Sequence, residues 1–413
     1  MVETLDLGDG LRQVPADGRA AAVVRAALAL DAGGSAAGRH VALRPLDASA
    51  AASVVEEVQA VGPDGRVAFD VRSSTPGRVA FGLFDAEAGS AAPLATIELA
   101  FTRKVVVLAP GFASALISRF AIFGQPTECA DPADPQSIRE ALICLGYRSD
   151  DGTAELAGAT IVDMSWETAP CTAADAAASG PDECVATIGR AADGSDVTWQ
   201  PADYDIGDPG LSMLRQQQVD LWGHRLAQTL VTYDRELRAT AGYGATFYLV
   251  GHSLGGQVVV RTLRAVLDDT DLAAGFEAAN RGRLAAVIAI DGALNWTGGL
   301  AETPADEPCG LPVRTVADES RERDNVAAVE DANARFGTVT VAITSAADPV
   351  VRPAVALLRE PATPSRGYVE AVFHEGAGGD VSQCTHSTLL RPEPTGYPLV
   401  ALFAEHIGPA ADD

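Results

Sequence analysis

The apolar residues of this chain follow two rhythms, and the change comes near residue 103. Before it, short apolar stretches are separated by turn-forming segments such as DAGGSAAG and GPDG. In RVAFDV, Val67, Phe69 and Val71 alternate with less apolar residues, which is the period of a half-buried strand. Short strands with Gly, Pro and Asp turns predict an antiparallel β-sandwich domain over residues 1–102.

From Lys104 onward the apolar runs are continuous. Strands buried on both faces are predicted for KVVVLAPGF, GATIVDMSW, ATFYLVG, RLAAVIAIDG and TVTVAITSAADP, as is typical of a parallel sheet. Helical patterns lie between them, in LSMLRQQQVDLWGHRLAQTLVTYDREL, QVVVRTLRAVLDD and RERDNVAAVEDANARFG. Alternating strands and helices predict an α/β domain over residues 103–413, with a mostly parallel sheet flanked by helices.

Composition limits the classes of partner. The chain has 413 residues, of which 47% are hydrophobic, enough for two folded cores. A formal net charge of -26 would repel a phosphate backbone, so nucleic acid is not an expected partner. Since no apolar run reaches the roughly 18 residues of a membrane span, we expect no transmembrane segment. The sequence shows no metal-binding pattern, and we expect no cofactor and no metal.

The cysteines bear on the cellular compartment. The six are Cys129, Cys144, Cys171, Cys184, Cys309 and Cys384. Nearest-neighbour pairing predicts disulfides 129–144 and 171–184, which leaves 309–384; six buried free thiols are the alternative. MVETLDLGDG lacks a signal-peptide pattern, so the protein is either cytosolic or a secreted protein whose signal peptide is absent from this sequence. Disulfides favour the secreted, oxidising setting.

The candidate chemistry begins at residues 251–255, which read G-H-S-L-G and fit the G-x-S-x-G pattern. An apolar strand pattern runs directly into it and a helical pattern follows, which predicts a sharp turn with Ser253 at its tip. A serine there is forced to positive φ, and Gly251 and Gly255 let backbones pass closely. We predict that Ser253 is a nucleophile and that His252 points away from the tip.

An oxyanion formed at Ser253 needs hydrogen-bond donors. The Leu254 N–H begins the predicted helix and is the first candidate. The Phe112 N–H, in the APGF loop after the first strand of the domain, is the second. An ordinary turn at Pro110-Gly111 is the alternative interpretation of that loop.

A serine hydroxyl also needs a base and an acid. His386, in a loop after the strand YVEAVF, is the preferred base, and His374 is the alternative. Asp348 ends the strand TVAITSAADP, which Pro349 stops, and is the preferred acid; Asp291, after AVIAI, is the alternative. The chain order Ser253, Asp348, His386 is the order of the α/β-hydrolase triad.

Residues 104–413 resemble an α/β-hydrolase of the serine esterase or lipase type, through VVVLAPGF, LVGHSLGGQVVV, SAADPVV and THSTLL. The resemblance implies an acyl-enzyme on Ser253, hydrolysis by water that His386 activates, and a small-molecule or lipid ester as substrate. Lipases of this group often have His-Gly where this chain has Pro110-Gly111. Amidase, thioesterase or acyltransferase chemistry on the same residues stays open.

Residues 1–102 resemble bacterial immunoglobulin-like domains of the invasin/intimin type. The matching stretches are VPADGRAAAVVRAALALDAGGSAAGRHVAL, GPDGRVAFDVRSSTPGRVAFGL and TIELAF. The resemblance implies a secreted or cell-surface protein whose first domain is a spacer, or an adhesive domain that contacts a cell surface or polymer. A surface adhesin with an inactive hydrolase scaffold is the alternative function.

Two polar insertions, at about residues 167–210 and 292–320, are predicted to cap the site. Neither is strongly apolar, whereas a lid that opens on a lipid surface exposes an apolar face. This composition favours an esterase, or a lipase without strong interfacial activation.

Overall fold

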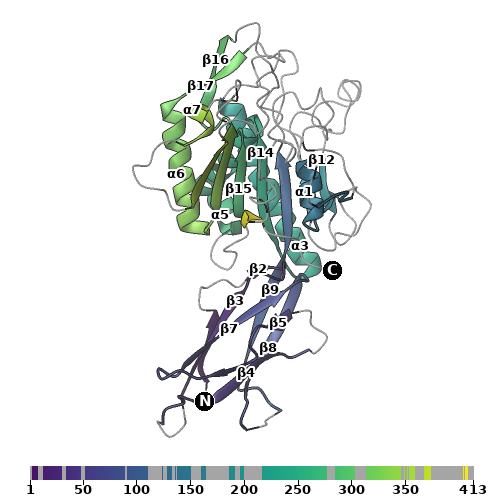
Figure 1. The fold of residues 1–413 in the computed structure, drawn as a ribbon, viewed down its shortest axis with the longest axis vertical. Helices are drawn as coiled ribbons and strands as arrows, with labels where there is room; N and C mark the ends of the chain where they lie inside the picture. The colour runs from purple at the N-terminus through teal and green to yellow at the C-terminus, as the bar shows by residue number, and fades with distance from the viewer. Residues whose placement is uncertain are drawn as a thin grey trace.

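The computed structural model describes much of the chain, in segments. The described residues are 2–7, 13–29, 34–47, 52–88, 91–109, 123, 128–132, 135, 137–149, 160–163, 186–190, 196–199, 216–276, 284–302, 313–345, 348, 351, 353–358, 367–373, 403 and 405–407. Figure 1 shows two regions stacked along the long axis, an all-β region that holds the N-terminus and a region of strands and helices.

The all-β region consists of short strands and one long one. Its strands are β1 (Val2–Leu7), β2 (Gln13–Pro15), β3 (Ala22–Leu28), β4 (His40–Pro45), β5 (Ala52–Val54), β6 (Val58–Ala60), β7 (Arg66–Ser73), β8 (Gly77–Asp85) and β9 (Ala95–Ala109). One sheet has the order β1-β3-β7-β5 and the other contains β6-β4-β8-β9; these neighbours are antiparallel, and β2 pairs with β9 in parallel.

The core of the all-β region explains why these strands form. Along β7 buried and exposed residues alternate for most of the strand, so that Val67, Phe69 and Val71 point inward. They join a buried cluster that includes Phe81 and Phe101 of the other sheet. An all-β region built on half-buried strands is thereby confirmed.

The second region alternates strands with helices. Its strands are β10 (Arg148–Ser149), β11 (Thr160–Asp163), β12 (Ala186–Arg190), β13 (Asp196–Trp199), β14 (Ala245–His252), β15 (Leu284–Ile290), β16 (Trp296–Glu302), β17 (Val313–Ala317), β18 (Val339–Ser345) and β19 (Tyr368–Phe373). Its helices are α1 (Ile138–Cys144), α3 (Gln216–Ala241), α4 (Leu254–Asp268), α5 (Thr270–Phe276), α6 (Glu319–Phe336) and α7 (Pro353–Ala356).

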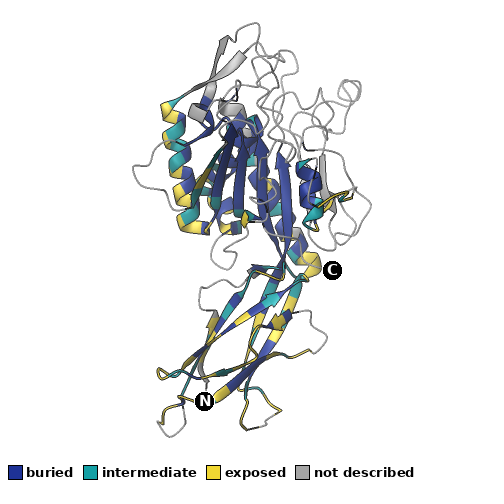
Figure 2. Cartoon of the chain, in the orientation of Figure 1, coloured by how far each residue is buried: buried dark blue, intermediate teal, exposed yellow. Residues whose placement is uncertain are grey.

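A parallel sheet forms the centre of this region. The order of its strands is β10-β11-β9-β14-β15-β18-β19, and each neighbouring pair is parallel. Every residue of β14 is buried, in line with its continuous apolar sequence. Helices α3, α4, α5 and α6 contribute to the buried cluster on one face, and α1 packs with Phe403 and Ile407 on the other. The buried strands between the helices are visible in Figure 2.

Strand β9 belongs to both regions. Residues 95–101 pair with β8 in the all-β region, and residues 103–109 pair with β14 in the parallel sheet. The predicted boundary between residues 102 and 103 thus lies inside a 15-residue strand. Lys104 marks the crossing: its side chain is fully buried, its Nζ lies 2.9 Å from Asp17 Oδ2, and it donates to the Ile407 carbonyl. The two regions therefore share backbone pairing and a buried ion pair.

Other predicted features can be located. A disulfide joins Cys129 and Cys144, which confirms that pairing; the other four cysteines lie outside the described residues. Within the predicted insertions, β12 pairs with β13 and β16 pairs with β17, both antiparallel. A capping role for these segments stays a prediction.

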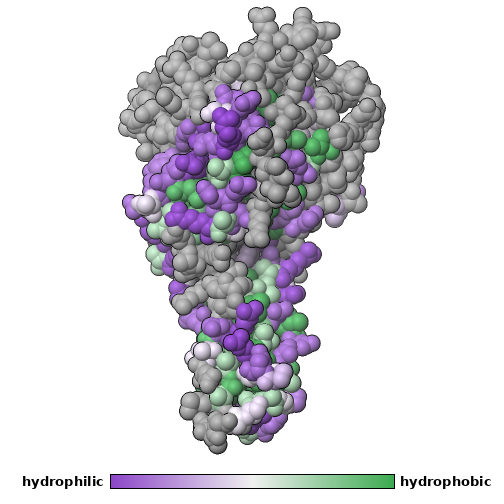
Figure 3. Space-filling view, turned by 90° about the vertical axis from the view of Figure 1, so that its left-hand side faces the viewer, coloured by the Kyte–Doolittle hydropathy of each residue, from purple (hydrophilic) through white to green (hydrophobic). Residues whose placement is uncertain are grey.

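The surface of the described residues is mostly polar. On the face drawn in Figure 3, apolar side chains lie in small groups among hydrophilic ones. In the part of the chain that the structure describes, the exposed large apolar residues are Leu46, Val55, Val58, Leu94 and Val369. None of the described helices combines the length and apolar composition that crossing a bilayer requires.

Candidate active site

Ser253 occupies a strained turn between β14 and α4. Its backbone has φ 54° and ψ -121°. A residue with a Cβ adopts this conformation only where the surrounding structure holds it there. The surrounding hydrogen bonds do so: Ser253 N donates to Ile290 O at 3.0 Å, and Ser253 O accepts from Gly256 N at 3.0 Å and Ala293 N at 3.1 Å. Ser253 is half-buried, while its neighbours His252 and Leu254 are buried.

The turn is possible because backbone passes directly over backbone. A Cβ placed on Gly251 would lie 2.3 Å from Gly255 O and 2.7 Å from Gly256 N. A Cβ on Gly256 would lie 2.5 Å from Gly292 Cα, in the turn after β15. The sequence predicts a close backbone approach at Gly251. It did not single out Gly256 or Gly292; for Gly256 the Gly-Gly pair after the serine was the available signal.

Helix α4 begins directly after the serine. Leu254 is its first residue, and the Ser253 side chain makes no capping hydrogen bond to the helix. The N–H groups at the start of a helix carry the positive end of the helix dipole. An anion formed beside Ser253 would therefore meet a favourable electrostatic field at this end of α4.

The two candidate acids lie at the same edge of the sheet as the elbow. Strands β14, β15 and β18 are neighbours and parallel, so Ser253, Asp291 and Asp348 all follow carboxyl ends of adjacent strands. Asp348 is 2% exposed, and its Oδ1 accepts from Val351 N at 3.0 Å. Asp291 is fully buried and adopts a positive φ of 43°.

Asp291 and Asp348 also interact with each other. The Oδ1 atom of Asp291 accepts from Thr344 Oγ1 at 2.9 Å and from Ser345 N at 3.1 Å. Burial raises the pKa of Asp291 well above its ordinary value, and the neighbouring carboxyl of Asp348 raises it further. The sequence offers the two residues as alternative acids, whereas the fold brings both together. Thr344 and Ser345 were not predicted as partners.

The remaining predicted site residues lie outside the described residues: Phe112, His374 and His386. Their roles stay predictions.

Three other histidines are described, and each lies on an element away from the elbow. His40 on β4 pairs with Glu87 in the all-β region. His224 on α3 lies 3.8 Å from Asp269, which follows the far end of the 15-residue helix α4, about 22 Å along its axis from Ser253. His406 precedes Ile407, whose carbonyl contacts Lys104 near the amino ends of the parallel strands.

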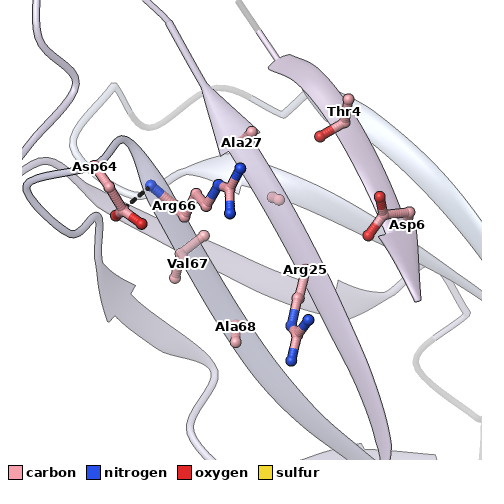
Figure 4. A pocket seen from close by; sticks show the side chains of 9 residues that line it. Thr4, Asp6, Arg25, Ala27, Asp64, Arg66, Val67 and Ala68 are labelled. Carbon is pink, nitrogen blue, oxygen red and sulfur yellow. Dashed lines mark hydrogen bonds between the residues drawn. The ribbon is translucent and has the colours of Figure 1, made fainter. Parts of the chain in front are cut away.

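A shallow pocket lies on the outer face of β1, β3 and β7 in the all-β region (Figure 4). Arg25 and Arg66 extend over small residues there, and Arg66 N donates to Asp64 Oδ1 at 3.2 Å. The residues that line it are Thr4, Asp6, Arg25, Ala26, Ala27, Asp64, Arg66, Val67 and Ala68. None of these described residues is a serine, cysteine or histidine, so the lining lacks both the hydroxyl or thiol nucleophile and the imidazole base that acyl transfer by a triad uses.

No protein-family model and no curated protein matches this sequence. The D0-D1 domain of intimin is similar at 16% identity and a TM-score of 0.21, over 26% of this chain and 58% of that one. A structure described as LipS and LipT, two metagenome-derived lipolytic enzymes, is similar at 14% identity and a TM-score of 0.32, over 74% of this chain and 94% of that one. A monoacylglycerol lipase of Paleococcus ferrophilus is similar at 14% identity and a TM-score of 0.25, over 45% and 76%. TM-scores this low do not establish a shared fold.

Proposed function

We propose that this protein is a serine hydrolase that cleaves carboxylic esters through an acyl-enzyme on Ser253. The observation that carries the proposal is the conformation of Ser253, which is held at positive φ between a buried strand and a helix N-terminus. A strained backbone of this kind lowers stability, and in proteins it is concentrated at active sites and ligand-binding sites. The region from residue 103 onward is, in this proposal, an α/β-hydrolase domain.

The proposed reaction has two steps. His386 takes the proton of the Ser253 hydroxyl while Oγ attacks the ester carbonyl, and the oxyanion accepts hydrogen bonds from Leu254 N–H and Phe112 N–H. His386 returns the proton to the departing alcohol. Water then attacks the acyl-enzyme with His386 as base, which releases the acid and restores Ser253. Asp348 holds the imidazole in its tautomer.

The all-β region is proposed to be an immunoglobulin-like domain of a secreted or cell-surface protein. The Cys129–Cys144 disulfide supports an oxidising compartment. Since β9 continues from one region into the other, this domain would act as a rigid extension of the enzyme.

The test is hydrolysis of p-nitrophenyl esters with acyl chains of increasing length, by wild type, Ser253→Ala and Asp348→Asn. We expect turnover by wild type, loss of about 10³-fold or more in Ser253→Ala, and a smaller but large loss in Asp348→Asn. Matched amide and thioester substrates separate esterase from amidase or thioesterase activity. Equal turnover by wild type and Ser253→Ala would contradict the proposal.

A further inference from the structure

The turn after β15 is hydrogen-bonded to the strand that carries the predicted acid. Asp291 N donates to Ile343 O at 2.7 Å, and Asp291 Oδ1 accepts from the last two residues of β18, Thr344 and Ser345. The same turn is hydrogen-bonded to the elbow, through Ile290 O and Ala293 N. Asp291 therefore lies in a turn that is hydrogen-bonded to the elbow on one side and to the end of β18 on the other.

The Asp291 carboxyl is held in a costly position. With Ser253, it is one of the two non-glycine residues at positive φ among those described. It is fully buried, and its Oδ2 atom accepts no hydrogen bond from the described residues. A buried carboxylate oxygen without a donor is unfavourable, so the ionised form of Asp291 is poorly accommodated.

Among the described residues, the charged group that acts on Asp291 is another carboxyl, that of Asp348. Strand β14 contributes the ionisable residues Tyr248 and His252, and β15 and β18 contain none. The first turn of α4, residues 254–257, is also uncharged. No lysine or arginine lies on these described segments to neutralise a second negative charge. Two adjacent buried carboxylates repel, whereas one proton between them forms a hydrogen bond.

We propose that Asp291 and Asp348 share one proton, which Asp291 donates to the Asp348 carboxylate, and that Asp291 thereby acts as a positioning residue for the acid of the site. Oδ1 of Asp291 already serves two donors, so Oδ2 is the oxygen available to carry the proton. The raised pKa of Asp291 agrees with this assignment. The role of Asp348 as acid rests on the proposed function; the shared proton does not.

The shared proton is tested through stability. An unfolded Asp ionises near pH 4, whereas folded Asp291 keeps its proton to higher pH. Between these two pKa values the unfolded chain binds fewer protons than the folded chain. The unfolding equilibrium constant of wild type therefore rises by about tenfold for each unit by which the pH rises. The asparagine of Asp291→Asn can donate the same hydrogen bond and does not titrate. This variant should therefore not show the loss of stability with rising pH.

The measurement is urea unfolding of wild type and Asp291→Asn at pH values from about 5 to 8. We expect the stability of Asp291→Asn relative to wild type to grow with pH by up to about tenfold in the unfolding constant per unit. Asp234→Asn is the matched control, since Asp234 is a buried carboxyl that pairs with Arg238 and should give no such gain. Parallel curves for wild type and Asp291→Asn would overturn the shared proton.

The positioning role is tested through ester hydrolysis. Asp291→Leu cannot donate a hydrogen bond and should lower kcat/KM about tenfold or more, whereas Asp291→Asn should recover most of that loss. Wild type should lose activity at alkaline pH as the shared proton leaves, and Asp291→Asn should keep it. If Asp291→Leu does not fold, the pH profile of Asp291→Asn decides. Identical alkaline limbs in wild type and Asp291→Asn would contradict the role, and a wild type without ester turnover would contradict only the proposed function.

Discussion

Replacing Gly251 by alanine tests the packing of the elbow directly. The added Cβ would lie 2.3 Å from Gly255 O, 2.5 Å from Gly255 C and 2.7 Å from Gly256 N. All three are backbone atoms of the first turn of α4, so no side chain can rotate away. Gly251 is not among the residues at positive φ, so the steric contact alone is the source of the effect.

The size of the effect follows from these distances. Ordinary contact for a Cβ begins near 3.4 Å, so the start of α4 would have to move by about 1 Å. Forcing a methyl group into a packed site costs about 1–3 kcal/mol, and the upper end applies here because three backbone atoms resist. A displacement of about 1 Å at Ser253 would lower kcat/KM by about 100-fold.

Urea unfolding and p-nitrophenyl ester hydrolysis measure the two consequences. Gly337→Ala is the matched control, because Gly337 ends α6 at φ 75° with nothing within 4 Å of its added Cβ. Gly337→Ala should lower the free energy of unfolding by about 1 kcal/mol and leave kcat/KM near that of wild type. A Gly251→Ala protein with wild-type stability and activity would refute the close packing at the elbow.

Two further perturbations test the rest of the fold. Asp17→Asn leaves the buried Lys104 without its ion pair and should cost about 3 kcal/mol at pH 7, measured by urea unfolding. Burial lowers the pKa of Lys104, and Asp17 opposes that shift. The difference in stability between Asp17→Asn and wild type should therefore narrow toward pH 10, as Lys104 loses its proton. A difference that does not change with pH would contradict this. Replacing both Cys129 and Cys144 by serine opens a link between residues 15 positions apart and should cost about 3 kcal/mol. The measurement is urea unfolding of this double variant and of wild type with and without a reducing agent. A wild type whose free energy of unfolding does not change on reduction would contradict a structural role for this disulfide.

The elements that the sequence predicted well are those whose pattern is local. The alternation in β7 and the continuous apolar run of β14 each reflect how that strand is buried, so both could be inferred from a few neighbouring residues. The elbow could be inferred for the same reason: strand, turn and helix are contiguous in the chain. Its glycines then follow from the steric demands of the turn.

The continuity of β9 could not be predicted in this way. Thr102, Arg103 and Lys104 resemble a polar break between two strands, yet all three are buried. Their partners come from distant parts of the chain, including Thr246, Tyr243 and Asp17. Long-range pairing makes a polar segment fit inside a strand, and a local pattern carries no sign of it.

The carboxyl pair illustrates the same limit at the site. Asp291 and Asp348 are far apart in the sequence and were predicted as alternatives for a single role. Because β15 and β18 are neighbours in the sheet, the residues that follow them come together. Strand order decides this, and the sequence does not state strand order.

Covalent trapping tests the central claim most directly, that the hydroxyl of Ser253 is an activated nucleophile. The full chain is incubated with a fluorophosphonate, which forms a stable phosphonyl ester with such hydroxyls, and the adduct is located by peptide mass spectrometry. We predict a single adduct on the peptide that contains Ser253, which forms when the native protein is treated and does not form when the protein is first unfolded in urea. A native protein that takes up no label, or that is labelled elsewhere and not at Ser253, would contradict the account.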